Sequence, residues 1–342
     1  MENYDVIIIG AGPAGLKCAE VLNNTNLKVL VIDRSKELGD KVCAGGLTIK
    51  GLKYLNIPED LIEFKSNRIL LHNSKKKFVI KNKKGDNYIF TINRKNLAEW
   101  QFEKIQDSKN ICFLKETNVI EIHKDFVVTD KGNFKFNILV GADGSNSKVR
   151  KYVGLKSLNT LVAFQYILPV KYDDLEVFYM PKLFKAEYLW IFPYRNTTSI
   201  GCACDVRQMS FNQALENFNN FIKSCNIDVS GAKYQSFIIN CDYQGYKFEN
   251  IYLIGDAGGF ASLLTGEGIY QALISGEEIA NKILDPCYKS KKLNKIIRHN
   301  KKHTWVFNQF NKFDFLLDQF IVIGNFLMKF YWLNQKIIKF FA

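Results

Sequence analysis

Two glycine-rich turns, far apart along the chain, have the residue types and spacing to bind a phosphate-bearing cofactor. The first follows the apolar run Tyr4–Ile9 and has the pattern G-x-G-x-x-G, formed by Gly10, Gly12 and Gly15. In this pattern the first glycine permits a tight bend, the second lets a pyrophosphate approach the backbone, and the third allows close helix–strand packing. Asp33 ends the next apolar run, where its carboxylate can accept hydrogen bonds from a ribose. The unit predicts an adenine dinucleotide but does not separate NAD from FAD.

The second turn is the segment 255–268, GDAGGFASLLTGEG, which follows the apolar run 250–254. A carboxylate at the end of a strand, here Asp256, can accept hydrogen bonds from the hydroxyls of a polyol chain. Gly266 and Gly268 precede a long helical pattern, so backbone N–H groups at a helix start can reach a ring system. An ordinary strand–loop–helix unit with an acidic cap is the structural alternative.

Two further polar positions point to the same ligand. In GADGSNSKVR, Asp143 follows a strand, and the serines after it can cap a short helix. Arg94 stands at the start of the helical pattern 93–106, where its guanidinium can bridge to a phosphate through two hydrogen bonds. For Arg94 alone, an ordinary surface arginine is the simpler interpretation.

These residues require a scaffold of alternating strands and helices. Two buried strands flank a helix over 13–23, while residues 160–201 have the pattern of an antiparallel sheet. Residues 68–92 alternate apolar and polar side chains and predict a hairpin that turns at 83–86. The sequence predicts an α/β fold (α+β overall) with three parts. The first is a Rossmann-like FAD-binding domain (1–67, 88–153 and 248–285). The others are an inserted antiparallel β-sheet substrate domain (68–87 and 154–247) and a C-terminal helical segment (286–342).

The order of these motifs is similar to that in FAD-dependent oxidoreductases of the p-hydroxybenzoate hydroxylase-like fold. More narrowly, KVCAGGL at 41–47, YLWIFP at 188–193 and GDAGGF…LTGEGIYQAL resemble the geranylgeranyl reductase family, with a likeness that covers residues 1–285. The resemblance implies that the cofactor is FAD. It also implies that the cofactor-binding residues are Gly10, Gly12, Ala14, Gly15, Asp33, Arg34, Cys43, Ala44, Gly46, Arg94, Val119, Asp143, Asp256, Gly266, Gly268 and Ile269.

The same resemblance implies reduction of isolated carbon–carbon double bonds in a prenyl chain. Flavin chemistry supplies a hydride, so a proton must come from water or from an acid in a dry pocket. Cys43 is the candidate catalytic residue, with a small apolar residue lining the ring as the alternative. Glu267 is a candidate base, with a carboxylate that stabilises a helix start as the alternative. No metal site is expected.

An aromatic strand face is the predicted substrate pocket. Tyr188, Trp190 and Phe192 alternate along the sequence, so their side chains share one face of a strand. Next to a flavin, this face fits an apolar substrate, while core packing is the alternative.

Other functions share these motifs. One is a flavin-dependent monooxygenase or halogenase that acts on an apolar or aromatic substrate, and another is a flavoprotein dehydrogenase that transfers electrons to a quinone or a protein partner. A non-catalytic lipid-binding protein belongs to a different class. The chain has no second dinucleotide fingerprint, so the electron donor, NADPH or a ferredoxin-like protein, is not determined.

Net charge and cysteine content limit the kinds of partner and the compartment that we expect. The 342 residues have a formal net charge of +13, which favours anionic partners, yet no nucleic-acid-binding motif accompanies the charge. The eight cysteines form no C-x-x-C pair, so we expect free thiols in a reducing compartment. Because no charged-then-apolar leader precedes Tyr4, we expect a cytoplasmic protein.

The last segment is helical, first basic and then aromatic. Its apolar run 320–333 is interrupted by Gly324, Asn325 and Lys329 and is shorter than the ~20 residues that a membrane-spanning helix needs. A block of lysines and arginine precedes it at 289–302. The segment is expected either to bind an anionic membrane, placing the protein peripherally on the inner face of the cell membrane, or to form a helical lid over the substrate domain.

Overall fold

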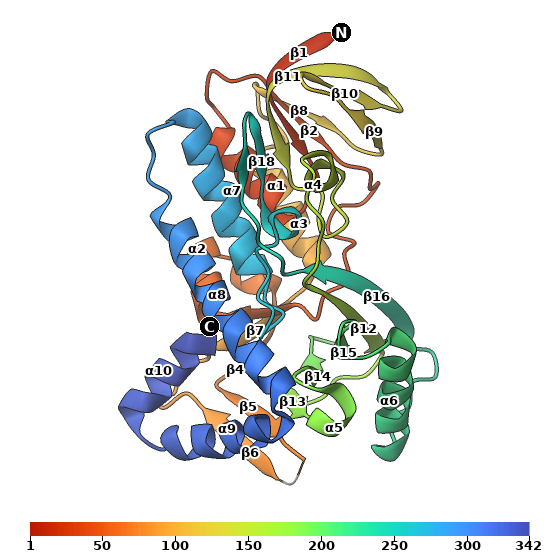
Figure 1. Ribbon diagram of the computed structural model, residues 1–342, viewed down its shortest axis with the longest axis vertical. Helices are drawn as coiled ribbons and strands as arrows, with labels where there is room; N and C mark the ends of the chain where they lie inside the picture. Colours follow the sequence, from red (N-terminus) through yellow and green to blue (C-terminus); the bar gives the residue numbers. More distant parts are fainter. Residues whose placement is uncertain (75, 342) are drawn as a thin grey trace.

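The computed structural model describes residues 1–74 and 76–341; residues 75 and 342, which belong to the expected sheet domain and C-terminal segment, lie outside the described part. Two large sheets follow one another along the long axis of the molecule, and helices cover their flanks (Figure 1). This arrangement confirms the mixed α/β fold class.

The first sheet contains the nucleotide-binding unit. In spatial order it consists of β17 (Lys247–Phe248), β18 (Ile251–Leu253), β11 (Gly132–Gly141), β1 (Glu2–Ile9), β2 (Val29–Ile32) and β8 (Ile111–Leu114). The strands from β18 to β8 are parallel, as expected for apolar runs that are buried on both faces.

Different elements bury the two faces of this sheet. Helices α1 (Pro13–Leu22), α3 (Arg94–Glu103) and α7 (Ile269–Leu284) contribute to the hydrophobic cluster on one face. The other face packs against α4 (Lys148–Tyr152) and a hairpin of β9 (Val119–Ile122) and β10 (Phe126–Thr129). With both faces covered, the carboxyl ends of the strands form the accessible edge at which both glycine turns begin.

The second sheet is the larger part of the inserted segment. Its spatial order is β16 (Lys233–Asn240), β12 (Thr160–Leu168), β15 (Thr198–Asp205), β14 (Tyr188–Pro193), β13 (Glu176–Tyr179), β5 (Arg68–His72) and β6 (Lys77–Lys81). Neighbouring strands are antiparallel except β13 and β5, which are parallel, so the expectation of a wholly antiparallel sheet was wrong at this pair. Helices α5 (Pro181–Phe184) and α6 (Phe211–Ser224) pack on one face, and the aromatic face lies opposite.

The hairpin predicted over 68–92 was wrong in its strand pairing, although a turn is present near the predicted place, where Gly85 N donates to Asn82 O at 2.9 Å. Strands β5 and β6 pair with each other before that turn, and Asn73 N donates to Lys76 O at 3.0 Å between them. Strand β7 (Ile89–Ile92) instead joins β3 (Gly46–Thr48) and β4 (Ile62–Ser66) in a separate three-stranded sheet. The alternation of side chains is the same in both arrangements, so the pattern could not show which polar segment reverses the chain.

The C-terminal segment is helical, as expected. Helix α8 (Lys291–Lys312) begins beside α7 and extends toward the second sheet, followed by α9 (Asp314–Leu327) and α10 (Tyr331–Phe341) (Figure 1). The remaining short helices are α2 (Ile49–Leu55), η1 (Glu59–Leu61) and η2 (Gly255–Gly258). Leu293 of α8 is buried in the core of the first sheet and Phe307 in a cluster below the second glycine turn, so α8 connects the two parts.

Candidate active site

A cavity of about 1090 Å³ extends from the strand ends of the first sheet to the aromatic face of the second. Gly10 and Gly12 lie on its wall at one end, and Leu317 and Ile321 of α9 lie on its wall at the other. The cavity therefore joins a part lined by polar turns to a part lined by apolar side chains.

The structure brings the predicted site residues together around this cavity, with one exception. Gly15 does not lie on the wall, because it packs inside the first turn. The predicted residues on the wall are Gly10, Gly12, Ala14, Asp33, Arg34, Cys43, Ala44, Gly46, Arg94, Val119, Asp143, Tyr188, Trp190, Phe192, Asp256, Gly266, Gly268 and Ile269.

The three glycines of the first turn have different surroundings. Gly10 has a φ of +104°, and a Cβ there would lie 2.3 Å from Ala142 O. A Cβ on Gly15 would lie 1.9 Å from Gly10 O, so this position serves packing alone. A Cβ on Gly12 would meet nothing within 4 Å, and α1 starts at the next residue. Thus the free N–H groups of a helix start border open space at Gly12, as an anion-binding turn requires.

Asp33 and Arg94 are two charged residues of the predicted set that lie on the cavity wall. Asp33 Oδ2 accepts a hydrogen bond from Ala11 N at 2.6 Å, and its Oδ1 accepts one from Ser35 N at 2.7 Å. Arg94 begins α3, which Asn93 caps, and its Nε is buried without a hydrogen-bond partner among the described residues. An unsatisfied guanidinium N–H is rare in a folded protein and fits a site that receives an anionic ligand.

Asp143 has a structural task in addition to its place on the wall. Its carboxylate accepts hydrogen bonds from Ser147 Oγ at 2.5 Å and from Lys148 N at 2.6 Å, which closes the start of α4. Burial raises the pKa of this carboxyl, and the hydrogen bonds partly oppose that shift. The expected serine cap is also present, because Ser147 Oγ accepts from Arg150 N at 2.8 Å.

At the second turn, Asp256 is held by two side chains. Its Oδ2 accepts from Ser145 Oγ at 2.9 Å and pairs with Lys41 Nζ at 2.5 Å. The Lys41 ammonium also lies 4.1 Å from the ring centroid of Phe237 on the second sheet. Lys41 therefore joins the loop before β3, the second turn and the substrate sheet at one point of the cavity wall.

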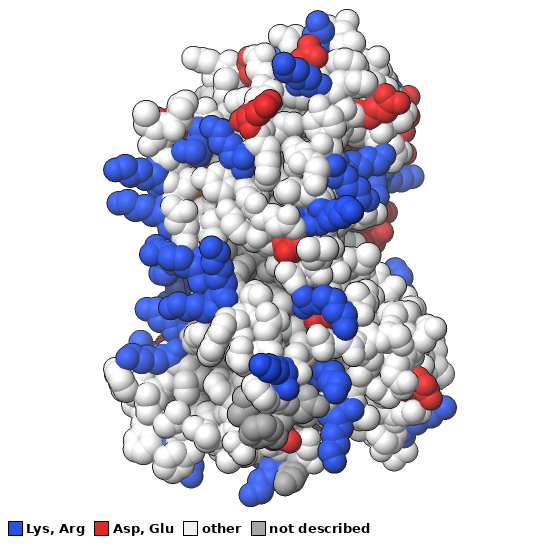
Figure 2. Space-filling view, viewed as in Figure 1, with Lys and Arg blue, Asp and Glu red and all other residues white. Residues whose placement is uncertain are grey.

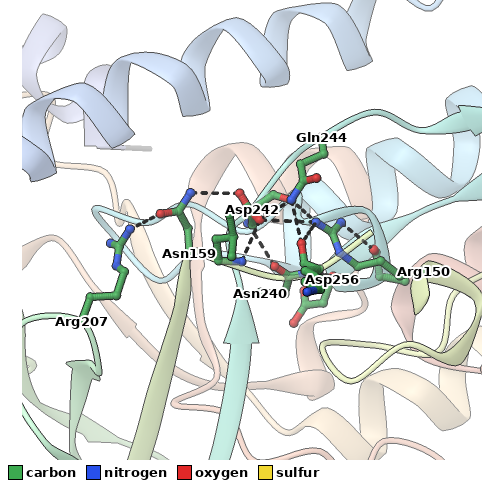
Figure 3. A network of polar contacts seen from close by, with 10 residues as sticks. Arg150, Asn159, Arg207, Asn240, Asp242, Gln244 and Asp256 are labelled. Carbon is green, nitrogen blue, oxygen red and sulfur yellow. Dashed lines mark hydrogen bonds and ion pairs between the residues drawn. The ribbon is translucent and has the colours of Figure 1, made fainter. Parts of the chain in front are cut away.

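A buried polar network fixes this turn to the two places where the chain passes between the sheets (Figure 3). Asn240, at the end of β16, donates from Nδ2 to Asp256 O at 2.9 Å. Asp242 accepts from Asn159 Nδ2, just before β12, at 2.9 Å. Arg150 donates to Asp242 O at 2.7 Å, and burial lowers the pKa of its guanidinium. The network sets the position of the second sheet relative to the cofactor turns.

The aromatic face lies directly beside the second turn. The rings of Tyr188 and Trp190, and those of Trp190 and Phe192, have centroids 6.3 Å apart. Tyr188 donates from its hydroxyl to Thr265 O at 2.6 Å, and burial raises its pKa well above the usual range. The alternative of pure core packing is therefore incomplete, since these rings form the core of the sheet and also line the cavity.

A chain of hydrogen bonds fixes the indole of Trp190. Its Nε1 donates to Ser199 Oγ at 2.8 Å, Ser199 donates to Gln165 Oε1 at 2.8 Å, and Gln165 donates to Gln235 Oε1 at 2.9 Å. Opposite the ring, a Cβ on Gly201 would lie 2.2 Å from an indole carbon, so only glycine leaves room for it.

Two titratable groups of the wall can handle protons. Glu267 accepts from Thr48 Oγ1 at 3.2 Å and from Gln271 Nε2 at 3.0 Å, and burial raises the pKa of its carboxyl. Gly268 is the N-cap of α7, so Glu267 lies directly before the helix start as well as on the cavity wall. Cys43 is half-buried, and its Sγ accepts from Gly45 N at 3.3 Å.

Several residues of the site were missed by the sequence analysis. Lys41 and Ser145 stand inside quoted motifs, but their common target, Asp256, is more than a hundred positions away in sequence. Gln165 and Ser199 lie in strands without a motif. Gly201 carried a signal, because a glycine inside an otherwise apolar strand often marks close packing.

Comparisons with known proteins agree with this geometry. Residues 4–166 match the pyridine nucleotide-disulphide oxidoreductase family. An uncharacterized protein of Methanosarcina barkeri is 33% identical over 304 residues, which cover 85% of this chain and 76% of the relative. The digeranylgeranylglycerophospholipid reductase of Methanococcus vannielii is 27% identical over 88% of this chain and 83% of the relative. The geranylgeranyl diphosphate reductase of Rhodobacter capsulatus is 25% identical over 81% of this chain and 74% of the relative.

Solved structures share the fold. A geranylgeranyl bacteriochlorophyll reductase-like protein from Thermoplasma acidophilum has a TM-score of 0.75 at 17% identity, covering 99% of this chain and 88% of its own. The p-nitrophenol 4-monooxygenase of Pseudomonas putida has a TM-score of 0.76 at 13% identity, covering 99% and 97%.

The fold, the two glycine turns and these relatives define an FAD-dependent oxidoreductase. Within that class, the chain belongs to the geranylgeranyl reductase family. None of the helices in the described part of the chain is long and apolar enough to cross a membrane.

Proposed function

We propose that this protein uses FAD to saturate carbon–carbon double bonds in a geranylgeranyl-type prenyl chain carried on a lipid. One observation carries the proposal: the polar part of the cavity, at the two glycine turns, opens directly into an apolar part of the same cavity. The names of the relatives, which are reductases of geranylgeranyl compounds, support the same substrate class.

The cofactor would extend along the strand ends of the first sheet. Gly10, Gly12 and Ala14 would receive the pyrophosphate together with Arg94, whose buried Nε has no partner among the described residues. Asp33, Arg34 and Val119 would border the adenosine end. The other end would meet Cys43, Ala44, Gly46, Asp143, Asp256, Gly266, Gly268 and Ile269. When bound, FAD supplies the hydride for reduction.

The chain's own residues would orient the alkene, exclude water and supply a proton. Trp190 and Phe192 would hold the prenyl chain against the wall, since both line the cavity and a hydrogen bond fixes the Trp190 indole. An isolated alkene has no carbonyl to accept charge, so positioning and a dry pocket must lower much of the barrier. Glu267, a half-buried carboxyl whose pKa burial raises, is the first candidate for the proton donor, and Cys43, which also lines the cavity, is the second.

The reductant and the location are part of the proposal. The electrons would come from outside the chain, from NADPH or from a ferredoxin-like protein that a basic surface would attract. The lipid substrate would place the protein on the inner face of the cell membrane as a peripheral protein.

The test is anaerobic turnover of the purified FAD-bound protein. The protein, reduced with dithionite, is mixed with a geranylgeranyl lipid, and the lipid is weighed by mass spectrometry. A gain of two hydrogen atoms per double bond is expected, without oxygen. NADPH and a ferredoxin then replace dithionite in turn to identify the donor.

A product that forms only with oxygen and carries an added oxygen or halogen atom would contradict the proposal. It would favour the monooxygenase or halogenase alternative. Rapid reduction of a quinone with an unchanged prenyl lipid would favour the electron-transfer alternative.

A further inference from the structure

Helices α9 and α10 form a hairpin at the apolar end of the cavity, and the second sheet holds it in place. Asn334 at the start of α10 is buried, donates from Nδ2 to Lys81 O at 2.8 Å and accepts from Lys83 N at 3.2 Å. At the other end of α10, His303 of α8 forms a hydrogen bond from Nε2 to Phe340 O at 3.0 Å. Hydrogen bonds therefore attach the hairpin to the second sheet and to α8, and the hairpin is part of the folded protein.

The inner side of this hairpin closes the cavity. Both helices contribute apolar side chains to the wall: Leu317, Ile321, Leu327, Met328, Ile337 and Ile338. In this respect the hairpin is the lid that the sequence allowed as one of two expectations.

The outer side of the hairpin is also apolar. Large hydrophobic side chains exposed on a folded protein are usually scattered, and a cluster of them marks an interaction site. Here seven fall within one short stretch: Phe320 (41% exposed), Val322 (47%), Ile323 (56%), Phe326 (54%), Phe330 (53%), Tyr331 (53%) and Trp332 (62%).

Two of these residues connect the outer surface to the cavity. Phe320 and Ile323 are each about half exposed to the outside, and both also line the cavity wall. Gly324 lies on the wall beside them and presents no side chain. At this point one layer of apolar side chains separates the cavity from the outside.

The charges around the exposed cluster identify the partner. Residues 289–342 include eleven lysines and arginines but only two acidic residues. Figure 2 shows few charged side chains over α9 and α10 and a row of basic ones on the flank above, over α8. Lys329 and Lys336 each lie beside an aromatic ring of the cluster, at 5.9 Å from Phe326 and 3.7 Å from Trp332. Aromatic groups with lysines at their edge match the interface of an anionic bilayer.

We propose that the outer face of α9 and α10 binds the surface of an anionic bilayer, and that the prenyl lipid passes between the cavity and the bilayer at Phe320 and Ile323. This inference rests on the proposed function for the identity of the lipid. Under this proposal the C-terminal segment has both expected roles, because the helices that form a lid over the cavity also form the membrane-binding surface.

The test uses the FAD-bound full chain and sedimentation with vesicles. Vesicles of phosphatidylcholine alone are compared with vesicles that also contain phosphatidylglycerol. Binding to the mixed vesicles is expected to exceed binding to the neutral ones by at least about tenfold at low salt. The double variant Phe326→Ser/Trp332→Ser should lose about tenfold or more in vesicle affinity, since neither residue lines the cavity.

A matched control removes exposed apolar groups elsewhere. Leu158→Ser/Val170→Ser, at positions that are 67% and 51% exposed, should bind vesicles like the wild type. Equal binding of all three proteins, or equal binding to neutral and anionic vesicles, would overturn the proposal. So would a wild-type dimer that the Phe326/Trp332 variant converts to a monomer without any vesicle binding, because the face would then be a subunit interface.

Activity separates this inference from the proposed function. The Phe326/Trp332 variant should reduce a short prenyl alcohol in detergent at the wild-type rate but should reduce vesicle-embedded lipid about tenfold more slowly. If the wild type reduces neither substrate and still binds anionic vesicles through these residues, the proposed function fails while membrane binding stands. Equal loss on both substrates would overturn the passage at this face.

Discussion

Glu267 and Thr48 are joined by a hydrogen bond of 3.2 Å from the threonine hydroxyl to Oε1 of the carboxyl. The bond connects the second glycine turn to β3, which directly follows the loop that carries Cys43. It helps to hold the carboxyl on the cavity wall, where Gln271 of α7 also donates to it at 3.0 Å. Burial raises the pKa of this half-buried carboxyl, and an acid held in this way can keep its proton and donate it to a substrate carbon.

The first prediction concerns the pH dependence of alkene reduction. Burial raises the pKa of Glu267, so the protonated acid persists above its ordinary range. The rate should therefore be constant at lower pH and fall as the pH rises through the raised pKa. Glu267→Gln should lower the rate of the dithionite-reduced protein by about 10²-fold or more and remove this fall.

The control for that measurement is Glu277→Gln on α7, the helix that follows Glu267; Glu277 pairs with Lys292 and does not line the cavity. It should keep the wild-type profile. If Glu267→Gln retained both rate and profile, the proton would come from elsewhere, and Cys43→Ala becomes the next variant to measure.

The second prediction separates two glycines of the first turn. Gly12→Val should fold normally, because its φ is −74° and nothing lies within 4 Å of the added Cβ. The side chain would fill the space beside the backbone where a pyrophosphate binds, so FAD affinity should fall by about 100-fold or more, equivalent to roughly 2.7 kcal/mol.

Gly15→Val should behave in the opposite way. Its Cβ would lie 1.9 Å from Gly10 O, so overpacking should lower the free energy of unfolding by about 1–3 kcal/mol or more. Flavin fluorescence titration and urea unfolding distinguish the two effects. A Gly12→Val protein that binds FAD like the wild type would show that the pyrophosphate lies elsewhere.

Local features made much of this site predictable. The turn at Gly10 and Gly12 needs only neighbouring residues, so its geometry follows from a short motif. The contact between Lys41 and Asp256 joins residues 215 positions apart and depends on how the loop before β3 folds against the second glycine turn. The pairing of β5 with β6 was missed because strand alternation sets which face is buried but not where the chain reverses.

The third prediction tests the contact between the aromatic strand and the second turn. Tyr188→Phe removes the hydrogen bond to Thr265 O and leaves the ring in place. Since such a bond contributes about 1 kcal/mol, the affinity for FAD should fall by roughly fivefold. Tyr152→Phe, at an exposed position of α4, should bind FAD like the wild type. An unchanged affinity in Tyr188→Phe would mean that the sheet does not steady the turn.

The last prediction concerns acid stability and the attachment of α10. His303 is 2% exposed, contacts Ser262 Oγ through Nδ1 at 2.7 Å and donates from Nε2 to Phe340 O, so it is neutral in the folded protein. Burial, aided by the nearby His299 and Lys50, lowers its pKa to about 4.

The sign of the effect follows from that shift. Below the ordinary pKa of 6.5 the unfolded chain takes up a proton that folded His303 does not bind until the pH is about 4. The free energy of unfolding should therefore fall as the pH drops through this window, by about 2 kcal/mol between pH 7 and pH 5, and should not depend on His303 above it. Urea unfolding at the two pH values measures the difference. In the His303→Asn variant, the free energy of unfolding should depend less on pH between pH 7 and pH 5. The control His123→Asn, at a partly exposed position, should keep the wild-type pH dependence. The same pH dependence in all three proteins would show that the contact with Phe340 forms no acid-sensitive attachment.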